Sequence, residues 1–262
     1  MNEELRVPLT EKQRAEYLTR IGADKKFPSA EYLNEIVRRQ LRTIPFDDAD
    51  VWTTGNPPSL ATEDLFDKII TRHRGGYCFE LNSLFCKFLV SLGFDAYLVI
   101  IHLGRGLAAG LGAPAHCGVI VRMDGVKYFA DVGYGGPVPD GAVPFGGEIV
   151  NDHRQYTSGV YTVVAAVTPD GEIPRFTFKD VPCDVCELLP LNYYVSKRDG
   201  SGFAGDLKMN MRYDGGFAEI GRGVFKYANG DTVIEKTIHS PEEAKKLAKE
   251  YFFVPDLPVR EF

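Results

Sequence analysis

Cys78 is the residue whose position most clearly indicates chemistry. It precedes Leu81 by three positions at the start of an apolar run with helical spacing, so it should lie at the N-terminus of a helix, on its buried side. Unpaired backbone N–H groups and the helix dipole favour a thiolate there, and a thiolate is a nucleophile. Gly75 and Gly76 come just before it and permit a close approach of the backbone. A buried structural cysteine is the alternative interpretation.

A predicted hairpin places a histidine and an aspartate close to each other. Asp124-Gly125 is a strong hairpin signal, and residues equally far from the centre of a two- or four-residue loop oppose each other. Asp131 then faces Gly118 and lies diagonally across from His116, with the two backbones roughly 7–8 Å apart. Taken singly, His116 could be a sheet histidine and Asp131 a turn residue. Together with a helix-start cysteine they make an activated-thiol site.

The elements that must position these residues begin with helices in the first ninety residues. Thr10 and Gln13 form a capping box, and a glycine stands where each of two helices should end, at Gly22 and Gly93. The strongest helical pattern covers 78–92. Helices are expected to open at Thr10, Ser29, Thr62 and Cys78.

After Gly93 the apolar pattern changes to a period of two, which predicts antiparallel strands. The expected strands cover 94–101, 116–123, 126–131, 161–167, 176–178, 224–227 and 232–236. Ser240 and Pro241 then open a C-terminal helix. The order of elements indicates an α+β fold with three parts, 1–92, 93–190 and 191–262, that pack on one another.

Composition excludes several classes of protein. The 262 residues carry 30 Lys+Arg and 36 Asp+Glu, and the scattered cations give a nucleic acid no basic stripe to bind. The longest apolar runs, such as 97–101, are far shorter than the ~18 residues of a membrane span. The N-terminus lacks the apolar stretch of a secretory signal, so we expect a cytoplasmic protein whose five cysteines are free thiols.

The residues around the candidate site resemble the arylamine N-acetyltransferases. The segments that carry the resemblance are 74–82 (RGGYCFELN), 92–94, His116 and 131–135 (DVGYG), with further matches at 17–22 and 44–46 and a weaker one at 201–203. The resemblance is dense as far as about residue 137 and thin afterwards.

This resemblance implies a fold and a mechanism. The fold has a helical N-terminal domain that carries the nucleophile, an antiparallel β-barrel middle domain with the histidine and aspartate, and a small α/β lid, with the triad arranged as in cysteine proteases. In a ping-pong reaction, Cys78 takes an acetyl group from acetyl-CoA and passes it to an arylamine, arylhydrazine or heteroaromatic amine. His116 acts as base and then acid, and Asp131 holds its tautomer. We expect the backbone N–H of Cys78 to be one oxyanion donor.

The resemblance also suggests substrate contacts. Tyr134, Phe46 and Phe203 are the expected substrate-binding residues. Tyr134 stands where the family commonly has Phe, and its added hydroxyl could shift the preference among acceptor amines. Asp47 stands where the family usually has Glu, which affects a local hydrogen bond and not the chemistry. No metal or other cofactor is implied, because acetyl-CoA is a substrate.

Three other motifs receive structural interpretations. The glycine-rich stretch 103–112 lacks the context of a dinucleotide loop and is expected to be a flexible loop. Cys183 and Cys186 have redox spacing, but we expect no helix to open there after a strand, and a second pair for zinc is lacking. The loop 196–202 could offer two cations to a CoA phosphate, although a solvated turn is the simpler interpretation.

Other functions remain open at this stage. An amide synthase, or a cysteine hydrolase or transamidase, could use the same Cys-His-Asp triad with another donor and acceptor. An inactive binding module is disfavoured by the intact triad. The sequence leaves open the natural acceptor, the acyl chain, the CoA binding mode and the oligomeric state.

Overall fold

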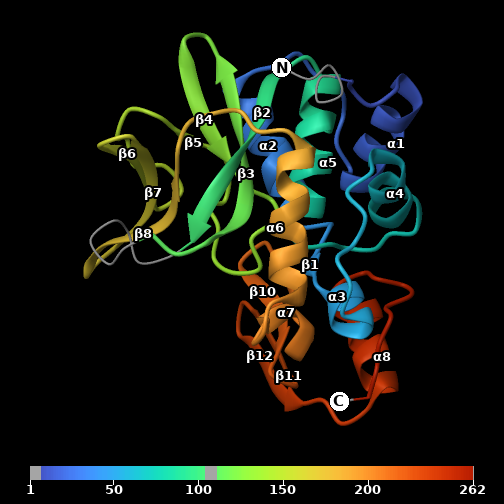
Figure 1. Cartoon of the computed structure of the whole chain (residues 1–262). Helices are drawn as coiled ribbons and strands as arrows, with labels where there is room; N and C mark the ends of the chain where they lie inside the picture. The colour runs from blue at the N-terminus through green and yellow to red at the C-terminus, as the bar shows by residue number, and fades with distance from the viewer. Residues whose placement is uncertain (1–6, 104–110, 262) are drawn as a thin grey trace.

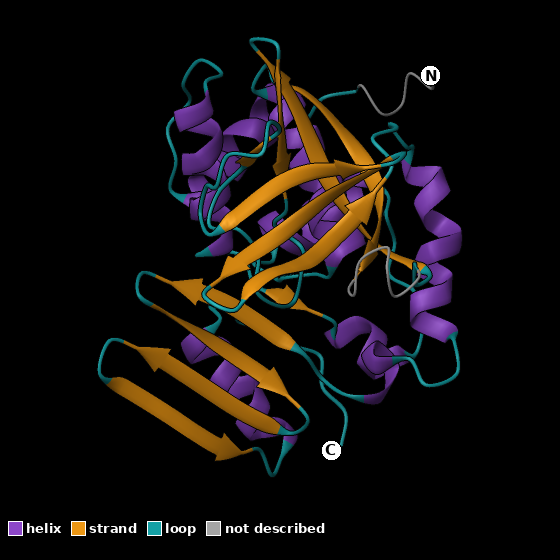
Figure 2. Cartoon of the chain, turned by 90° about the vertical axis from the view of Figure 1, so that its left-hand side faces the viewer, coloured by secondary structure: helices purple, strands orange, loops and turns teal. Residues whose placement is uncertain are grey.

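The computed structural model describes residues 7–103 and 111–261 (Figure 1). Helices pack against a seven-stranded antiparallel sheet at one end of the molecule, and a five-stranded antiparallel sheet lies at the other end (Figure 2). The α+β fold class is therefore confirmed. The helices are α1 (Glu11–Ile21), α2 (Ala30–Leu41), α3 (Ala49–Thr54), α4 (Thr62–Phe66), a π-helical turn (Asp67–Thr71), α5 (Cys78–Ser91), α6 (Val185–Lys197), α7 (Gly202–Gly205) and α8 (Pro241–Tyr251).

The predicted ends of the first helix are confirmed. The Thr10 hydroxyl accepts from the Gln13 backbone N–H at 3.2 Å, and the Gln13 side chain accepts from the Thr10 N–H at 3.0 Å. Gly22 ends α1 with a φ of +64°, a conformation that favours glycine. The buried face of α1 reaches α5, where the rings of Tyr17 and Phe88 stack with centroids 3.8 Å apart. This contact fixes α5 in the helical layer.

α5 is the central helix of the fold. It begins at Cys78 and ends at Ser91, and Gly93 follows with a φ of +95°, as the spacing predicts. It packs against α1, α4 and the barrel strands β2 and β3. Because α5 is covered on several sides, its first residue is held firmly beside the barrel.

The larger sheet curls into a nearly closed barrel. Its strand order is β5-β4-β3-β2-β8-β7-β6, and the outer strands β5 and β6 lie close together. The strands are β2 (Asp95–Leu103), β3 (Pro114–Met123), β4 (Val126–Ala130), β5 (Val143–Pro144), β6 (His153–Ser158), β7 (Tyr161–Thr168) and β8 (Gly171–Phe178). The β3–β4 pair opposes Met123 to Val126 and Val119 to Ala130, so the predicted two-residue loop and register are confirmed.

One strand of the smaller sheet comes from the helical N-terminal region, far away in the sequence. Its order is β1-β9-β10-β11-β12, where β1 is Phe46–Asp47 and pairs with β9. The other strands are β9 (Met209–Tyr213), β10 (Gly216–Gly221), β11 (Val224–Asn229) and β12 (Thr232–Thr237). The predicted β11–β12 pair and the helix after Ser240 are confirmed, whereas β9 and β10 were not predicted.

Two apolar cores hold the chain together. The first joins α1, α2, α5 and α6 to the barrel, and the second joins the smaller sheet to α8 and to Ala49 and Trp52 of α3. The division at residues 92 and 190 stays a prediction, and α6 runs across residue 190. None of the helices in the described ranges is long and apolar enough to cross a membrane.

The expectation for Cys183 and Cys186 was wrong in one respect. Cys183 bridges to Leu98 of the barrel, and α6 opens immediately afterwards, with the Glu187 side chain accepting from the Asp184 N–H at 2.7 Å. Pro190 hides this helix in the sequence because proline usually breaks helix interiors. Of the stretch 103–112, residues 104–110 lie outside the described residues.

Candidate active site

The structure brings Cys78, His116 and Asp131 together. Cys78 is the first residue of α5, and His116 lies near the start of β3. His116 Nε2 is 2.5 Å from Asp131 Oδ2, which leaves Nδ1 as the ring nitrogen available to a hydrogen bond with the Cys78 thiol. All three side chains are almost fully buried. The hairpin register therefore places the imidazole and carboxylate as predicted.

His116 is held in its charged form. Burial by itself would lower the pKa of His116, but the charges of Asp131 and Cys78 and the hydrogen bonds to both raise this pKa to about 10. An imidazolium is thus favoured at neutral pH beside the cysteine. An imidazolium beside the sulfur favours a thiolate, which is the reactive form of cysteine.

Asn82 fixes the carboxylate and was missed as a site residue. Its Nδ2 donates to Asp131 Oδ1 at 2.9 Å and to the Cys117 carbonyl at 2.8 Å, while its Oδ1 accepts from Val132 N at 3.0 Å. Gly133 N donates to the same Asp131 oxygen at 2.8 Å. The available signal was spacing, since Asn82 lies one helical turn after Cys78 and shares its face of α5.

The loop before Cys78 rests on the strand β1. Asp47 Oδ2 accepts from Gly75 N at 3.0 Å, so this position makes a local hydrogen bond with the short side chain of Asp. A Cβ on Gly75 would lie 2.3 Å from the Pro45 carbonyl oxygen. Gly75 is therefore required by the close approach of two backbone segments.

Buried charged side chains also stabilise the loop before Cys78. Lys68 Nζ lies 2.7 Å from Glu80 Oε1 and 2.5 Å from Asp50 Oδ2, and Arg74 lies 3.2 Å from Asp50. Glu80 also accepts from Tyr77 N at 3.1 Å, which caps the start of α5. Burial raises the pKa of Glu80 to about 7 against the opposing effect of Lys68. These contacts fix the backbone on which Cys78 stands.

A cavity of about 220 Å³ adjoins the thiol. The described residues that line it are Phe46, Cys78, Leu103, Ala115, His116, Gly133, Tyr134, Gly135, Phe203 and Lys208. The three residues expected to bind substrate, Tyr134, Phe46 and Phe203, all belong to this wall, and their roles stay predictions. The Cys78 N–H lies at the first position of α5, where a helix offers no internal acceptor, and its oxyanion role stays a prediction too.

The cations of the loop 196–202 do not line this cavity. Lys197 belongs to α6 and donates to Asn56 Oδ1 at 2.7 Å, and the Arg198 guanidinium lies 5.3 Å from the Tyr194 ring centroid. Lys208, which sequence reasoning did not single out, is instead the lysine of the cavity wall. Within residues 7–103 and 111–261, no group of three or more His, Cys, Asp and Glu side chains is placed to hold a metal ion.

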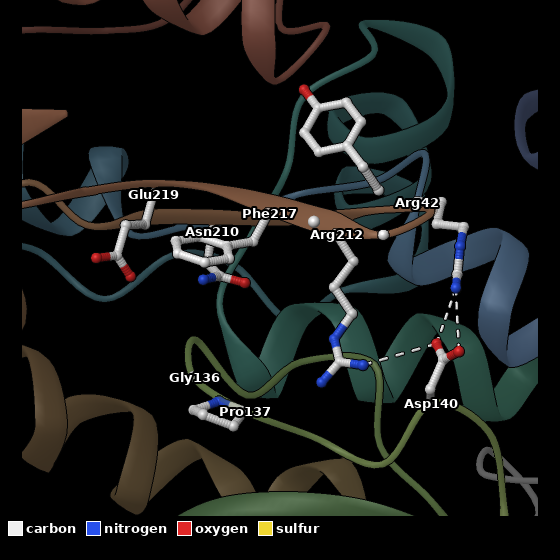
Figure 3. Close-up of a pocket in the computed structure, with 11 residues that line it drawn as sticks. Arg42, Gly136, Pro137, Asp140, Asn210, Arg212, Phe217 and Glu219 are labelled. Carbon is white, nitrogen blue, oxygen red and sulfur yellow. Dashed lines mark hydrogen bonds and ion pairs between the residues drawn. The ribbon is translucent and has the colours of Figure 1, made fainter. Parts of the chain in front are cut away.

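Two larger cavities lie away from the triad. One of about 470 Å³ lies between the segment 136–140 and strands β9 and β10, where Asp140 pairs with Arg42 and Arg212 (Figure 3). The other, about 630 Å³, lies between residues 57–62 and the first half of α6. Neither is lined by a triad residue.

Comparison with known proteins shows consistent similarities. A family model described as N-acetyltransferase matches residues 29–257. A curated arylamine N-acetyltransferase of Mycolicibacterium smegmatis is 31% identical over 228 residues, which cover 82% of each chain. The solved arylamine N-acetyltransferase of Salmonella typhimurium is similar in fold, with a TM-score of 0.87, 21% identity and coverage of 97% and 96%. A Mycobacterium marinum arylamine N-acetyltransferase in complex with CoA has a TM-score of 0.80 and 22% identity over 92% of each chain.

Proposed function

Because this chain belongs to the arylamine N-acetyltransferase family, we propose that it uses Cys78 to move an acetyl group from acetyl-CoA to an aromatic amine. The observation that carries the proposal is the position of Cys78. It lies at a helix start, beside the His116–Asp131 pair and next to a cavity with aromatic walls. Such a site suits acyl transfer through a thioester.

The first half of the reaction loads the enzyme. The Cys78 thiolate attacks the acetyl carbonyl carbon of acetyl-CoA, and a tetrahedral intermediate with a negative oxygen forms. The Cys78 N–H at the start of α5 donates to that oxygen. When the carbon–sulfur bond to CoA breaks, the CoA sulfur leaves with the bond electrons and takes the proton of the His116 imidazolium. Acetyl-Cys78 and free CoA result.

The second half transfers the acetyl group. The aromatic amine attacks the carbonyl carbon of acetyl-Cys78, and neutral His116 accepts the amine proton as general base. The carbon–sulfur bond then breaks, so that an amide and the Cys78 thiolate form beside a newly charged imidazolium. Asp131 stabilises that imidazolium and keeps its ring oriented, as the hydrogen bond to Nε2 requires.

Acetylation in the absence of amine tests the proposal. With acetyl-CoA alone, intact mass should show one added acetyl group and peptide mapping should place it on Cys78, because ping-pong chemistry accumulates the acyl-enzyme. Adding an aromatic amine should discharge it to the N-acetyl product. A Cys78→Ser variant should take up no acetyl group. Acetyl on another cysteine would contradict the assignment, and discharge only to water would indicate a hydrolase.

The matched control is the double variant of Cys183, which precedes α6, and Cys186, which lies on it. Cys186 is exposed and Cys183 is buried at the barrel, and neither lines the cavity of Cys78. Cys183→Ser with Cys186→Ser should therefore keep most of the activity. Total loss of activity in the folded double variant would show that these thiols take part in the reaction.

We also propose a cytoplasmic location. The reaction needs Cys78 as a free thiol, and the five cysteines are unpaired in the structure. A reducing compartment keeps thiols in that state. Activity that persists in glutathione buffer and falls in glutathione disulfide would support this assignment.

A further inference from the structure

Lys208 gives the cavity beside Cys78 an unneutralised positive charge. Its ammonium lies 5.1 Å from the ring centroid of Phe203 and donates to the Gly202 carbonyl. Its side chain is only partly buried. Among the described residues, no carboxylate lies within ion-pair distance of this nitrogen, although ion pairs engage many other lysines of the chain. The charge is thus available to a ligand.

The neighbouring carboxyl of Asp48 does not cancel this charge. Asp48 and Lys208 bind each other through the backbone, where Lys208 N donates to Asp48 Oδ1 at 2.8 Å and Asp48 N donates to the Lys208 carbonyl at 3.2 Å. Asp48 is 2% exposed, and its Oδ2 has no hydrogen-bond partner in the described ranges. Burial raises the pKa of Asp48 well above its usual value, against the effect of Lys208. These two hydrogen bonds therefore position the backbone of Lys208, while the Asp48 carboxyl forms no ion pair with the ammonium.

The cavity has the size and the walls for one aromatic ring. Its volume of about 220 Å³ exceeds the ~150 Å³ of an engineered apolar cavity that binds benzene. The ring centroids of Phe46 and Phe203 lie 6.3 Å apart on the side of Lys208, and those of Tyr134 and His116 lie 5.5 Å apart on the side of the triad. A ring bound between these groups would present substituents toward the triad and toward the ammonium.

We infer that Lys208 selects aromatic amines that carry a carboxylate on the ring, by pairing with that carboxylate while the amino group faces acetyl-Cys78. This inference rests on the proposed transfer to aromatic amines and specifies the acceptor. An ammonium is a compact charge that needs no fixed geometry from its partner, so aminobenzoates of different substitution can be accepted. Neutral amines of the same size would bind without this contribution.

The test compares two acceptors that differ in charge and little in shape, 4-aminobenzoate and 4-aminobenzamide. In the wild type, kcat/KM should favour the acid. Lys208→Met keeps the apolar stem on Phe203 and should lower that preference by roughly three- to fivefold, mainly through the KM of the acid, which corresponds to a partly exposed ion pair. Lys208→Arg keeps the charge and should retain most of the preference. Lys226→Met, on the distant strand β11, is the matched control and should change nothing.

The half-reactions separate the other outcomes. Acylation of Cys78 is measured with acetyl-CoA and with 4-nitrophenyl acetate, and neither rate should change in Lys208→Met. A loss confined to acetyl-CoA would assign the ammonium to the donor and overturn the inference. An unchanged ratio of the two acceptors in folded Lys208→Met would also overturn it. If wild type acetylates neither acceptor nor any other aromatic amine, the proposed function itself fails.

Discussion

The two oxygens of Asp131 have different partners. Oδ2 meets His116, and Oδ1 accepts from Asn82 and from Gly133 N. An amide in place of the carboxylate cannot satisfy both sets of donors and can also stabilise the wrong imidazole tautomer. We expect Asp131→Asn to lower turnover by about 10⁴, as in a related triad. Alkylation of Cys78 by iodoacetamide should also shift to higher pH, with circular dichroism to verify folding. A folded variant with wild-type alkylation and turnover would remove Asp131 from the triad.

The same variant gives a pH dependence of stability. His116 titrates near its ordinary value of about 6.5 when unfolded and at about 10 in the fold. Because the pKa of His116 is raised in the fold, the stabilisation that the charged imidazolium gives the folded state is complete below about pH 6.5 and is lost as pH rises to about 10. The difference in unfolding free energy between wild type and Asp131→Asn should therefore shrink across this window. Urea denaturation at several pH values measures it, and a constant difference would contradict the assigned cause.

Tyr134 offers a test of acceptor choice. Its ring centroid lies 5.5 Å from that of His116, and Tyr134 lines the cavity beside Cys78. Tyr134→Phe removes one hydroxyl and restores the residue that the family commonly has. The ranking of a panel of aromatic amines should change, while acylation of Cys78 by acetyl-CoA stays the same. An unchanged ranking would mean that the hydroxyl does not meet the acceptor.

At the scale of elements, the segment before α5 decides where the thiol stands. A Cβ on Gly75 would meet the Pro45 carbonyl at 2.3 Å, so β1 and the loop would have to separate. Gly75→Ala should cost about 1–3 kcal/mol of stability and reduce acylation of Cys78. Gly221→Ala on β10 is the control, because a Cβ at that position would meet no atom within 4 Å among the described residues other than its two chain neighbours. Equal unfolding free energies of the two variants would contradict the steric argument.

Local signals explain which elements the sequence could predict. The β3–β4 register follows from Asp124-Gly125, so His116 and Asp131 could be placed beside each other in advance. α1 and α5 follow from caps and spacing, which put Cys78 at a helix start, but neither pattern places that helix start beside the hairpin. β1 is two residues long and pairs with a strand more than 150 positions away, which no local pattern reveals. Lys208 was missed for the same reason, because its place in the cavity depends on how residues 46–48 meet β9.

At the scale of the whole molecule, Asp140 ties three regions together. It accepts two hydrogen bonds from Arg42 at the end of α2, at 2.8 and 3.0 Å, and lies 3.7 Å from Arg212 of β9 (Figure 3). Arg42 also reaches Asp214 at 2.6 Å, after β9. The helical layer, the barrel and the smaller sheet therefore share one network of charges around this carboxylate.

Removing that charge should loosen the arrangement. Asp140→Asn is expected to cost about 1 kcal/mol, since the pair is only partly buried. The hydrogen bond and charge of Arg42 lower the pKa of Asp140, so the cost should be present above about pH 4 and vanish as pH falls further. Chemical denaturation of wild type and Asp140→Asn at several pH values measures this loss of unfolding free energy. Asp67→Asn breaks an exposed pair with Arg72 and should cost almost nothing; an equal loss in both would refute a special role for Asp140.

The strand exchange at β1 has a consequence for fragments of the chain. β9 pairs with β10 on one side and with Phe46–Asp47 on the other. A truncated C-terminal piece that starts after α6 would keep β9 to β12 and α8 but lose the strand that covers β9. The N–H and C=O groups on that side of β9 would then be open to pairing with another copy, which is how exposed edges start aggregation. Proteolysis in the loop after α6 should therefore yield a piece that self-associates once it is separated from residues 46–47.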